Sequence, residues 1–277
     1  MFAETAVTKW QKEFSSKRIR TSCRELDVAL SNGIPTGVIT EFCGPPGCGK
    51  TQICLQLCVN VQLPCELDGL DGEAVFIDTN CGYSPYRFRS IATAQSTLCQ
   101  NVSQNFHSTP VSVLMDKFMN GIKSYFVRDY GELLAVIHNL WTLLTENRRI
   151  RLIVIDSFSC LFRQMKGDVI LSQTVYVTLT NLQKLANNFG CAIVLTNELT
   201  RRPVSTSDMT DFIVPALGDS HLHRIGQLIT LDQECVGSDV FLAKIDKALH
   251  AAETVVKFRI TENGIESAAP KRLRTQQ

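Results

Sequence analysis

The sequence lacks a long apolar run and a charge bias. No stretch approaches the roughly 20 consecutive apolar residues that a membrane-spanning helix needs, and no apolar core follows the first residues, as a secretory signal would require. The 28 basic and 27 acidic side chains leave a net charge of +1. We therefore expect no membrane partner, and we expect any nucleic-acid contact to come from local basic clusters instead of overall charge.

The sequence also lacks the cysteine spacing of a zinc or disulfide framework. None of the 11 cysteines lies in a C-x-x-C pair, and Cys54, Cys160 and Cys191 stand in apolar runs. We therefore expect free, buried thiols in a reducing compartment. No internal repeat and no clear domain break interrupts the 277 residues. We expect one globular core over 21–265, between a flexible basic lead-in at 1–20 and a basic tail at 266–277.

What the sequence does contain is a phosphate-binding motif, G-x-x-x-x-G-K-T. The pattern of 38–42 predicts a strand before it and that of 52–59 a helix after it, which argues against a chance match in a Gly/Pro-rich turn. Glycines let backbone N–H groups approach a triphosphate, and a helix start adds partial positive charge. The lysine suits the β- and γ-phosphates, and the threonine hydroxyl suits magnesium. The candidate phosphate-binding residues are Gly44, Pro45, Pro46, Gly47, Cys48, Gly49, Lys50, Thr51 and Gln52.

A second nucleotide motif follows downstream. The apolar strand predicted at 152–156 ends in Asp156. Many buried strands end in an aspartate, but one that follows a phosphate loop indicates a magnesium ligand. We therefore expect Asp156 to act on a magnesium ion together with Thr51.

Alternating strands and helices predict the fold class. Further strands are expected at 73–79, 122–127 and 190–197, with short terminal strands at 224–231, 239–245 and 253–260. Helices are expected at 21–30 (capped by Thr21 or Ser22), 86–98, 130–145 and 169–188. Segments 99–121 and 198–222 show little pattern. This order predicts an α/β fold, with a mostly parallel sheet, helices on both faces and an antiparallel C-terminal edge.

The motif set resembles the RecA/RadA family of DNA strand-exchange ATPases, within it the eukaryotic recombinase paralogues, and among these the C paralogues in particular. The resemblance covers about 20–265 and is carried by Thr40-Glu41-Phe42-Cys43-Gly44 before the phosphate loop, and by 72–79, 128–135, 152–156, 194–197 and 215–220. It implies a RecA-like P-loop ATPase core that binds ATP and Mg²⁺. It also implies a hetero-complex with other recombinase paralogue subunits, and action on DNA, single-stranded or at junctions. The setting implied is homologous recombination and double-strand-break repair in the nucleus, including meiotic recombination.

The resemblance also assigns candidate roles beyond the phosphate loop. Arg87 falls where the family places an arginine against the adenine ring, an arrangement that suits a planar guanidinium. Two further segments, after 157 and after 198, fall where the family has its DNA-facing loops. The candidate DNA-phosphate contacts there are Arg163, Lys166, Arg201 and Arg202. For each of these five arginines and lysines, a solvated surface charge is the alternative interpretation.

Two departures from the family pattern bear on catalysis. Asn80 stands where the family has the glutamate that positions the attacking water, and an amide is not basic near neutral pH. Glu198 stands where the family has a glutamine that senses the γ-phosphate. Both changes predict ATP binding with slow or absent hydrolysis. The alternative is that a neighbouring subunit, or Glu41 or Asp78, substitutes for the missing base.

Three functions follow from these observations. The preferred one is a nucleotide-gated scaffold subunit of a DNA recombination complex. The second is an active DNA-dependent ATPase in strand exchange, and the third is a P-loop small-molecule kinase, for which no arginine-rich lid segment is evident. Because only a short lead-in precedes the core, where relatives usually carry a small helical domain, we expect a defined hetero-complex instead of a long filament.

Overall fold

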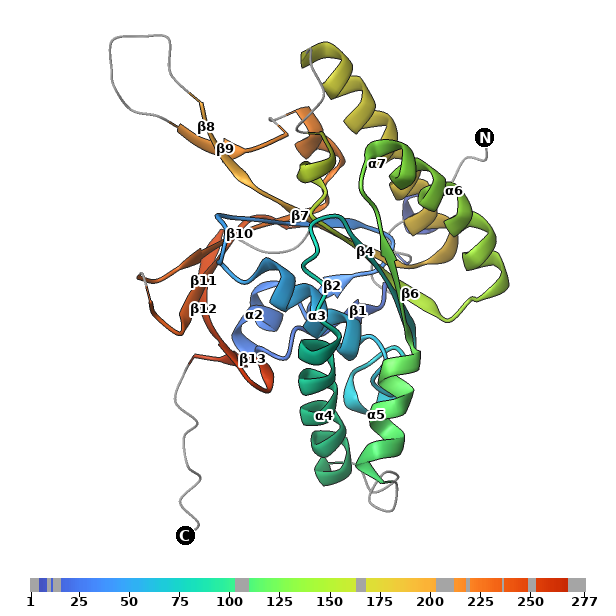
Figure 1. Ribbon diagram of the computed structural model, residues 1–277, viewed down its shortest axis with the longest axis vertical. Coiled ribbons are helices and arrows are strands. Elements are labelled where there is room, and N and C mark those ends of the chain that lie inside the picture. The colour runs from blue at the N-terminus through green and yellow to red at the C-terminus, as the bar shows by residue number, and fades with distance from the viewer. Residues whose placement is uncertain are drawn as a thin grey trace.

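The computed structural model is built around a mixed sheet with helices on both faces (Figure 1). It describes residues 5–8, 11, 16–102, 110–162, 168–202, 212–217, 220–235, 237–248 and 253–268. Within these ranges the sheet has 9 strands in the order β13-β12-β11-β10-β3-β7-β6-β4-β5. Its strands are β3 (Ile39–Cys43), β4 (Glu73–Asp78), β5 (Ile122–Phe126), β6 (Ile150–Asp156), β7 (Ala192–Asn197), β10 (Gln227–Gln233), β11 (Val240–Lys247), β12 (Thr254–Thr261) and β13 (Gly264–Ser267).

The sheet has a parallel part and an antiparallel part. From β10 through β3, β7, β6 and β4 to β5, every neighbouring pair is parallel. The strands β10, β11, β12 and β13 pair antiparallel with one another. The predicted α/β fold with an antiparallel C-terminal edge is therefore confirmed.

Helices cover the two faces of the sheet. The helices are α2 (Arg24–Ala29), α3 (Lys50–Asn60), α4 (Pro85–Val102), α5 (Val111–Asn120), α6 (Tyr130–Glu146) and α7 (Asp168–Phe189), with short 3-10 turns η1 (Cys65–Leu67), η3 (Ser159–Phe162) and η4 (Ser220–Arg224). Alternate residues of β6 point to opposite faces. Val154 packs in the cluster that includes α3, α4 and α5, and Ile153 and Ile155 pack in the cluster that includes α6 and α7.

Several elements were not predicted. Helix α5 lies in the segment 99–121. Its buried residues are Leu114 and Phe118, four positions apart. Strands β8 (Leu199–Arg202) and β9 (Phe212–Pro215) form an antiparallel hairpin within 198–222, and β13 adds a last strand. Short elements of this kind carry too few residues for a hydrophobic period to stand out.

The packed core extends beyond the predicted limits of 21 and 265. Ile19 is fully buried in β1 (Arg18–Ile19), which pairs with β2 (Ile34–Pro35). At the other end, Ser267 closes β13. The lead-in and tail predicted at 1–20 and 266–277 therefore both contribute residues to the fold, and 269–277 lie outside the described residues.

The predicted cap of the first helix was wrong. The N-cap of α2 is Cys23, which makes no side-chain capping bond. Thr21 instead donates from its backbone N and from its hydroxyl to Asp27 Oδ1, at 2.8 and 2.9 Å. Thr21 therefore bonds to a side chain six positions further along and does not cap the helix.

Two further observations concern membrane-spanning helices and cysteines. No helix in the described ranges is long and apolar enough to cross a membrane. The cysteines, all of which fall in described positions, are free thiols, and Cys54, Cys58 and Cys191 are among those that are buried.

Candidate nucleotide-binding site

The phosphate loop connects β3 to α3 at the carboxyl end of the strand. Gly47 and Gly49 have φ angles of +82° and +92°, a region that side chains rarely adopt. A Cβ atom on Gly49 would also lie 2.5 Å from Ile260 Cδ1 of β12. Both glycines are therefore required by the loop as it stands, and the loop ends at the N-terminus of α3, where free N–H groups favour an anion.

The Lys50 ammonium lies over the loop. Its Nζ donates to the carbonyls of Gly44 and Pro45, at 2.7 and 2.9 Å. A phosphate placed on the loop would compete with these two carbonyls for the same hydrogens. Cys48, within the motif, is buried, and burial raises the pKa of its thiol, which makes it a packing residue and not a nucleophile.

The two predicted magnesium ligands meet in the structure. The hydroxyl of Thr51 donates to Asp156 Oδ2 at 2.6 Å, and that of Thr196 donates to Asp156 Oδ1 at 2.5 Å. Burial raises the pKa of Asp156, against the effect of these two hydrogen bonds. Sequence reasoning missed Thr196, although it stands at the end of a strand next to β6.

This donor set fits a magnesium ion that keeps most of its water. Hydroxyl and carboxylate oxygens are the ligands that Mg²⁺ prefers, and it usually takes only one or two from the protein and others from phosphates. No group of three or more His, Cys, Asp or Glu side chains in the described residues could hold a metal alone. Thr51 and Asp156 would therefore hold the ion jointly with a nucleotide.

The loop after β4 runs beside this pair of ligands. Asp78 accepts backbone hydrogen bonds from Asn80, Gly82 and Tyr83, at 3.0, 3.1 and 3.0 Å. A Cβ atom on Gly82 would lie 3.6 Å from Asp156 Oδ2. The Asn80 side chain is exposed. Asp78 thus shapes the loop with both carboxylate oxygens and is not free to replace the missing base.

Glu41 is equally engaged. It is fully buried in β3, where it contacts Asn197 and His221. Glu198 follows Asn197 at the end of β7 and is half-buried, and its backbone N donates to Ser159 Oγ at 3.2 Å. The structure therefore argues against Glu41 and Asp78 as substitute bases, and a neighbouring subunit stays an alternative source.

Arg87 is bound by three acceptors of its own chain. Its Nε donates to Gln52 Oε1, and its Nη1 and Nη2 donate to the carbonyls of Glu262 and Thr261, each at 2.6 Å. These bonds tie the start of α4 to α3 and to the turn between β12 and β13. The N–H groups at the edge of the guanidinium are thus used in hydrogen bonds within the chain. A nucleotide base could contact only the planar faces of the group.

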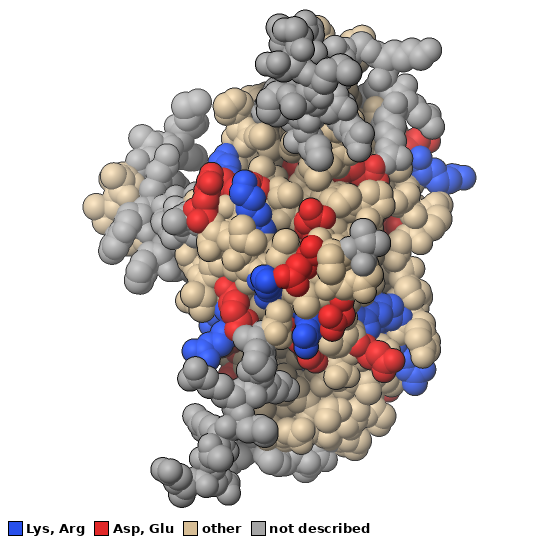
Figure 2. Space-filling model, turned by 90° about the vertical axis from the view of Figure 1, so that its left-hand side faces the viewer, with Lys and Arg blue, Asp and Glu red and all other residues tan. Residues whose placement is uncertain are grey.

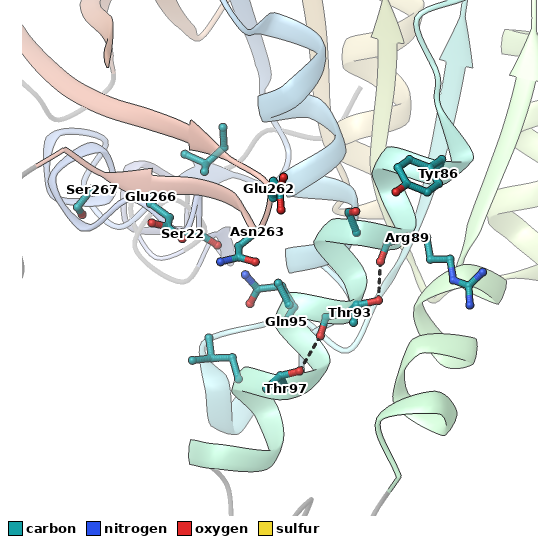
Figure 3. A pocket seen from close by; sticks show the side chains of 14 residues that line it. Ser22, Tyr86, Arg89, Thr93, Gln95, Thr97, Glu262, Asn263, Glu266 and Ser267 are labelled. Carbon is teal, nitrogen blue, oxygen red and sulfur yellow. Dashed lines mark hydrogen bonds between the residues drawn. The ribbon is translucent and has the colours of Figure 1, made fainter. Parts of the chain in front are cut away.

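A cleft of about 910 Å³ lies beside the Arg87 contacts and not at the phosphate loop. Figure 3 shows it between the outer side of α4, with Tyr86, Arg89 and Gln95, and the β12–β13 turn, with Glu262 and Asn263. Polar and apolar surface both line it. The cleft therefore continues from the end of the candidate site at which a base would lie.

The four candidate DNA contacts are only partly described. Arg163 and Lys166 lie outside the described residues. Arg201 and Arg202 lie in β8, paired with Ile213 and Phe212 of β9, and their side chains are not described. The hairpin projects from the sheet at the same end of the molecule as the start of α7 (top of Figure 1).

The described residues on the face formed by the C-terminal strands form no single-sign patch. Figure 2 shows basic and acidic side chains interspersed on it. Several of them pair, as Lys244 does with Asp246 at 2.7 Å, and Lys257 with Glu234. This agrees with the near-zero net charge and leaves local clusters as the candidates for nucleic-acid contact.

Comparisons with known proteins agree with this fold. The Rad51 family model matches residues 14–268. The chain is 35% identical over 211 residues to "DNA repair protein RAD51 homolog 3" of Dictyostelium discoideum, covering 75% of this chain and 55% of that protein. It is 31% identical over 273 residues to the protein of the same name from Cricetulus griseus, covering 96% of this chain and 72% of that protein. The predicted likeness to the C paralogues, which are the third homologues, is thus confirmed, and the kinase alternative is set aside. The chain belongs to the Rad51 family.

Proposed function

We propose that this chain is an ATP-binding subunit of a complex for homologous recombination and DNA double-strand-break repair, including meiotic recombination, in the nucleus. ATP and Mg²⁺ are its cofactors, with the triphosphate on Gly44–Thr51 and Gln52, the ion at Thr51 and Asp156, and the base beside Arg87. Its partners are other recombinase paralogue subunits and DNA, single-stranded or at junctions. The names of the relatives, which are DNA repair proteins, support this proposal.

The observation that carries the scaffold role is that the described residues considered as the base are poorly placed for it. Asn80 presents an amide where a carboxylate is needed, Asp78 accepts three backbone N–H groups, and Glu41 is buried and paired. A site with phosphate and metal ligands but no base would hold ATP longer than it hydrolyses it. ATP bound in this way stabilises whichever arrangement of loops and subunit surfaces binds it best.

An active DNA-dependent ATPase is the second candidate. It is favoured by the intact Thr51–Asp156 pair and would need a neighbouring subunit to supply the base. Release of inorganic phosphate, measured with single-stranded DNA and the purified partner, separates the two. We expect little DNA-stimulated turnover and a partner pull-down that depends on ATP but not on hydrolysis.

Lys50→Ala is the test variant, and Lys184→Ala, an exposed lysine on α7, is the matched control. The first should abolish the ATP-dependent pull-down, and the second should leave it unchanged. Robust DNA-stimulated turnover in the wild type, abolished by Lys50→Ala, would contradict the scaffold role.

DNA contact is tested by removing the charges of Arg201 and Arg202 together. For single strands, each lost phosphate contact should reduce the slope of log K against log salt by about 0.7. A matched double variant at Arg148 and Arg149 removes the same charge next to the start of β6, the opposite end of the parallel strands. Equal weakening by both double variants would show a non-specific charge effect and move the contact elsewhere.

A further inference from the structure

The cleft between α4 and the β12–β13 turn is larger than the proposed nucleotide site needs. Its volume of about 910 Å³ lies near the upper end of the roughly 300–1,000 Å³ usual for ligand pockets. Its far end is formed by Thr97 and Leu98, which follow Arg87 on α4 by about 15 Å along the helix. A base beside Arg87 would therefore leave this end of the cleft empty.

One wall of the cleft carries negative charge. Glu262 lies in the β12–β13 turn and Glu266 on β13, and both reach solvent. Neither forms an ion pair within the described part of the chain, and Arg259, opposite Glu266 in the strand pair, is bound to Asp239 at 3.5 Å. Arg89 is the one basic side chain among the described residues that line the cleft, and Figure 3 shows it directed away from the turn. The turn side of the cleft therefore favours a cationic ligand.

The opposite wall, on α4, is uncharged and partly apolar. Ala94 and Leu98 contribute to it, and Leu98 is 51% exposed. The hydroxyls of Thr93 and Thr97 donate to backbone carbonyls one turn earlier in the helix, at 2.9 and 3.1 Å, as Figure 3 shows. They are therefore not free to donate to a ligand. A ligand that matches both walls has positive charge on one side and an apolar group on the other.

The chain itself contains a segment with this chemistry. Residues 269–277 follow β13 in the sequence and lie outside the described residues. They include Lys271, Arg272 and Arg274, with Leu273 between the two arginines, and no acidic residue. In an extended segment successive side chains point to opposite sides. The two arginines would then face one wall of the cleft while the leucine faces the other.

The segment is also close enough to enter the cleft. Ser267, the last residue of β13, itself lines the cleft. Arg274 comes seven residues later, which gives it a reach of up to about 25 Å. A short connection of this kind holds the segment near the cleft at an effective concentration in the millimolar range. Contacts that are individually weak, such as exposed ion pairs, are then sufficient to keep it bound.

We propose that the C-terminal basic segment (271–274) docks in the cleft between α4 and the β12–β13 turn. Its arginines pair with Glu262 and Glu266, and its leucine packs against Leu98. The docked segment fills the far end of the cleft, and its cations are paired within the chain and withheld from other anionic partners. The contact requires no nucleotide, so it goes beyond the proposed function and does not depend on it.

Trypsin tests the docking on the full chain, because it cleaves after lysine and arginine and acts on the undocked segment. Loss of the C-terminal residues is followed by intact mass, and each rate is divided by that of a free peptide with the sequence of 266–277. At low salt, Glu262→Gln combined with Glu266→Gln should be cleaved about fivefold faster than wild type, since two exposed ion pairs are lost. Leu98→Ser should also be cleaved faster.

Matched variants control for charge and for surface leucines. Glu146→Gln combined with Glu253→Gln removes the same charge at the end of α6 and before β12, both exposed positions away from the cleft. Leu134→Ser replaces a leucine on α6 that is 38% exposed. Both controls should be cleaved at the wild-type rate. All of these variants keep the sequence of the tail, so the sites for trypsin are unchanged.

The outcomes are distinct. Equal normalised cleavage rates in wild type and the cleft variants would overturn the docking. Protection that disappears when the protein is diluted would place the segment on a second copy of the chain and overturn the contact within one chain. Where the variants do not fold, the wild type decides: its normalised cleavage rate should rise about fivefold between low salt and about 0.5 M salt, and a constant rate would overturn the docking. A chain that binds no ATP would contradict the proposed function and leave the docking standing.

Discussion

Replacing Arg87 by alanine should destabilise the protein even without nucleotide. The side chain donates three hydrogen bonds of 2.6 Å to Gln52 Oε1 and to the carbonyls of Glu262 and Thr261. A buried hydrogen bond to a charged group contributes about 1.5–3 kcal/mol. Because Arg87 is half-exposed, solvent competes for these bonds, and we expect a total loss of about 2–3 kcal/mol, below the roughly 4.5–9 kcal/mol that three such buried bonds would contribute.

Urea unfolding of Arg87→Ala without nucleotide gives this loss directly. The matched control is Arg89→Ala, two residues along α4, an exposed side chain that should change stability by no more than about 0.5 kcal/mol. Arg87→Lys keeps the charge but not the forked donors, so it should recover only a minor part of the loss.

Adding ATP to the same experiment separates the two roles of Arg87. At a hundred times its Kd, a ligand stabilises the folded state by about 2.7 kcal/mol. If Arg87 serves only as a connection between α3, α4 and the β12–β13 turn, this increment stays the same in Arg87→Ala. If the guanidinium face also stacks on the base, the increment falls. Arg87→Ala as stable as Arg89→Ala in the absence of ATP would refute the reasoning.

Three further predictions concern other parts of the molecule. Asn80→Glu should raise ATP turnover about tenfold or more if the missing base is limiting, and unchanged phosphate release would mean that another residue or a neighbouring subunit supplies it. Burial raises the pKa of Asp27, so the ionised acid costs stability above that pKa. Asp27→Asn should therefore be more stable than wild type in urea at neutral pH, by a margin that shrinks as the pH falls toward 3.8, whereas a constant margin would contradict it. Gly264→Ala, whose Cβ would lie 1.9 Å from Gln56 Oε1 at a φ of +119°, should lose about 3 kcal/mol. Its control, Gly37→Ala, also has positive φ but open space, and should lose about 1 kcal/mol; equal thermal shifts would contradict the packing argument.

Much of the fold was predictable because local sequence patterns specify its strands and helices. The strand, glycine-rich loop and helix around Lys50 carry their own signals, as do the long helices with apolar residues at helical spacing. The approach of Thr51 to Asp156 also followed, because both stand at the carboxyl ends of parallel strands, where ligands bind. Helix α5 and the β8–β9 hairpin were missed because each is too short for a hydrophobic period to stand out.

The meaning of individual polar residues was less predictable. Thr21 reads as a helix cap but bonds to Asp27, and Asp78 reads as a spare acid but shapes the loop after β4. In both cases the sequence shows a polar residue and several acceptable partners nearby. The hydrogen bond that forms depends on which backbone groups the fold leaves unsatisfied.

Residue types and their spacing along the chain were enough to predict a phosphate loop and a mostly parallel sheet, since these depend on neighbours in sequence, and to single out Thr51 and Asp156 as candidate metal ligands. Only the folded arrangement decided that Arg87 is bound by Glu262 and that Glu41 is paired with His221, partners 175 and 180 positions apart. The pattern of residues along the chain does not indicate which distant side chains come into contact. The free-energy cost of burying a charged side chain depends on the partners that tertiary packing places next to it, and so does its chemical role.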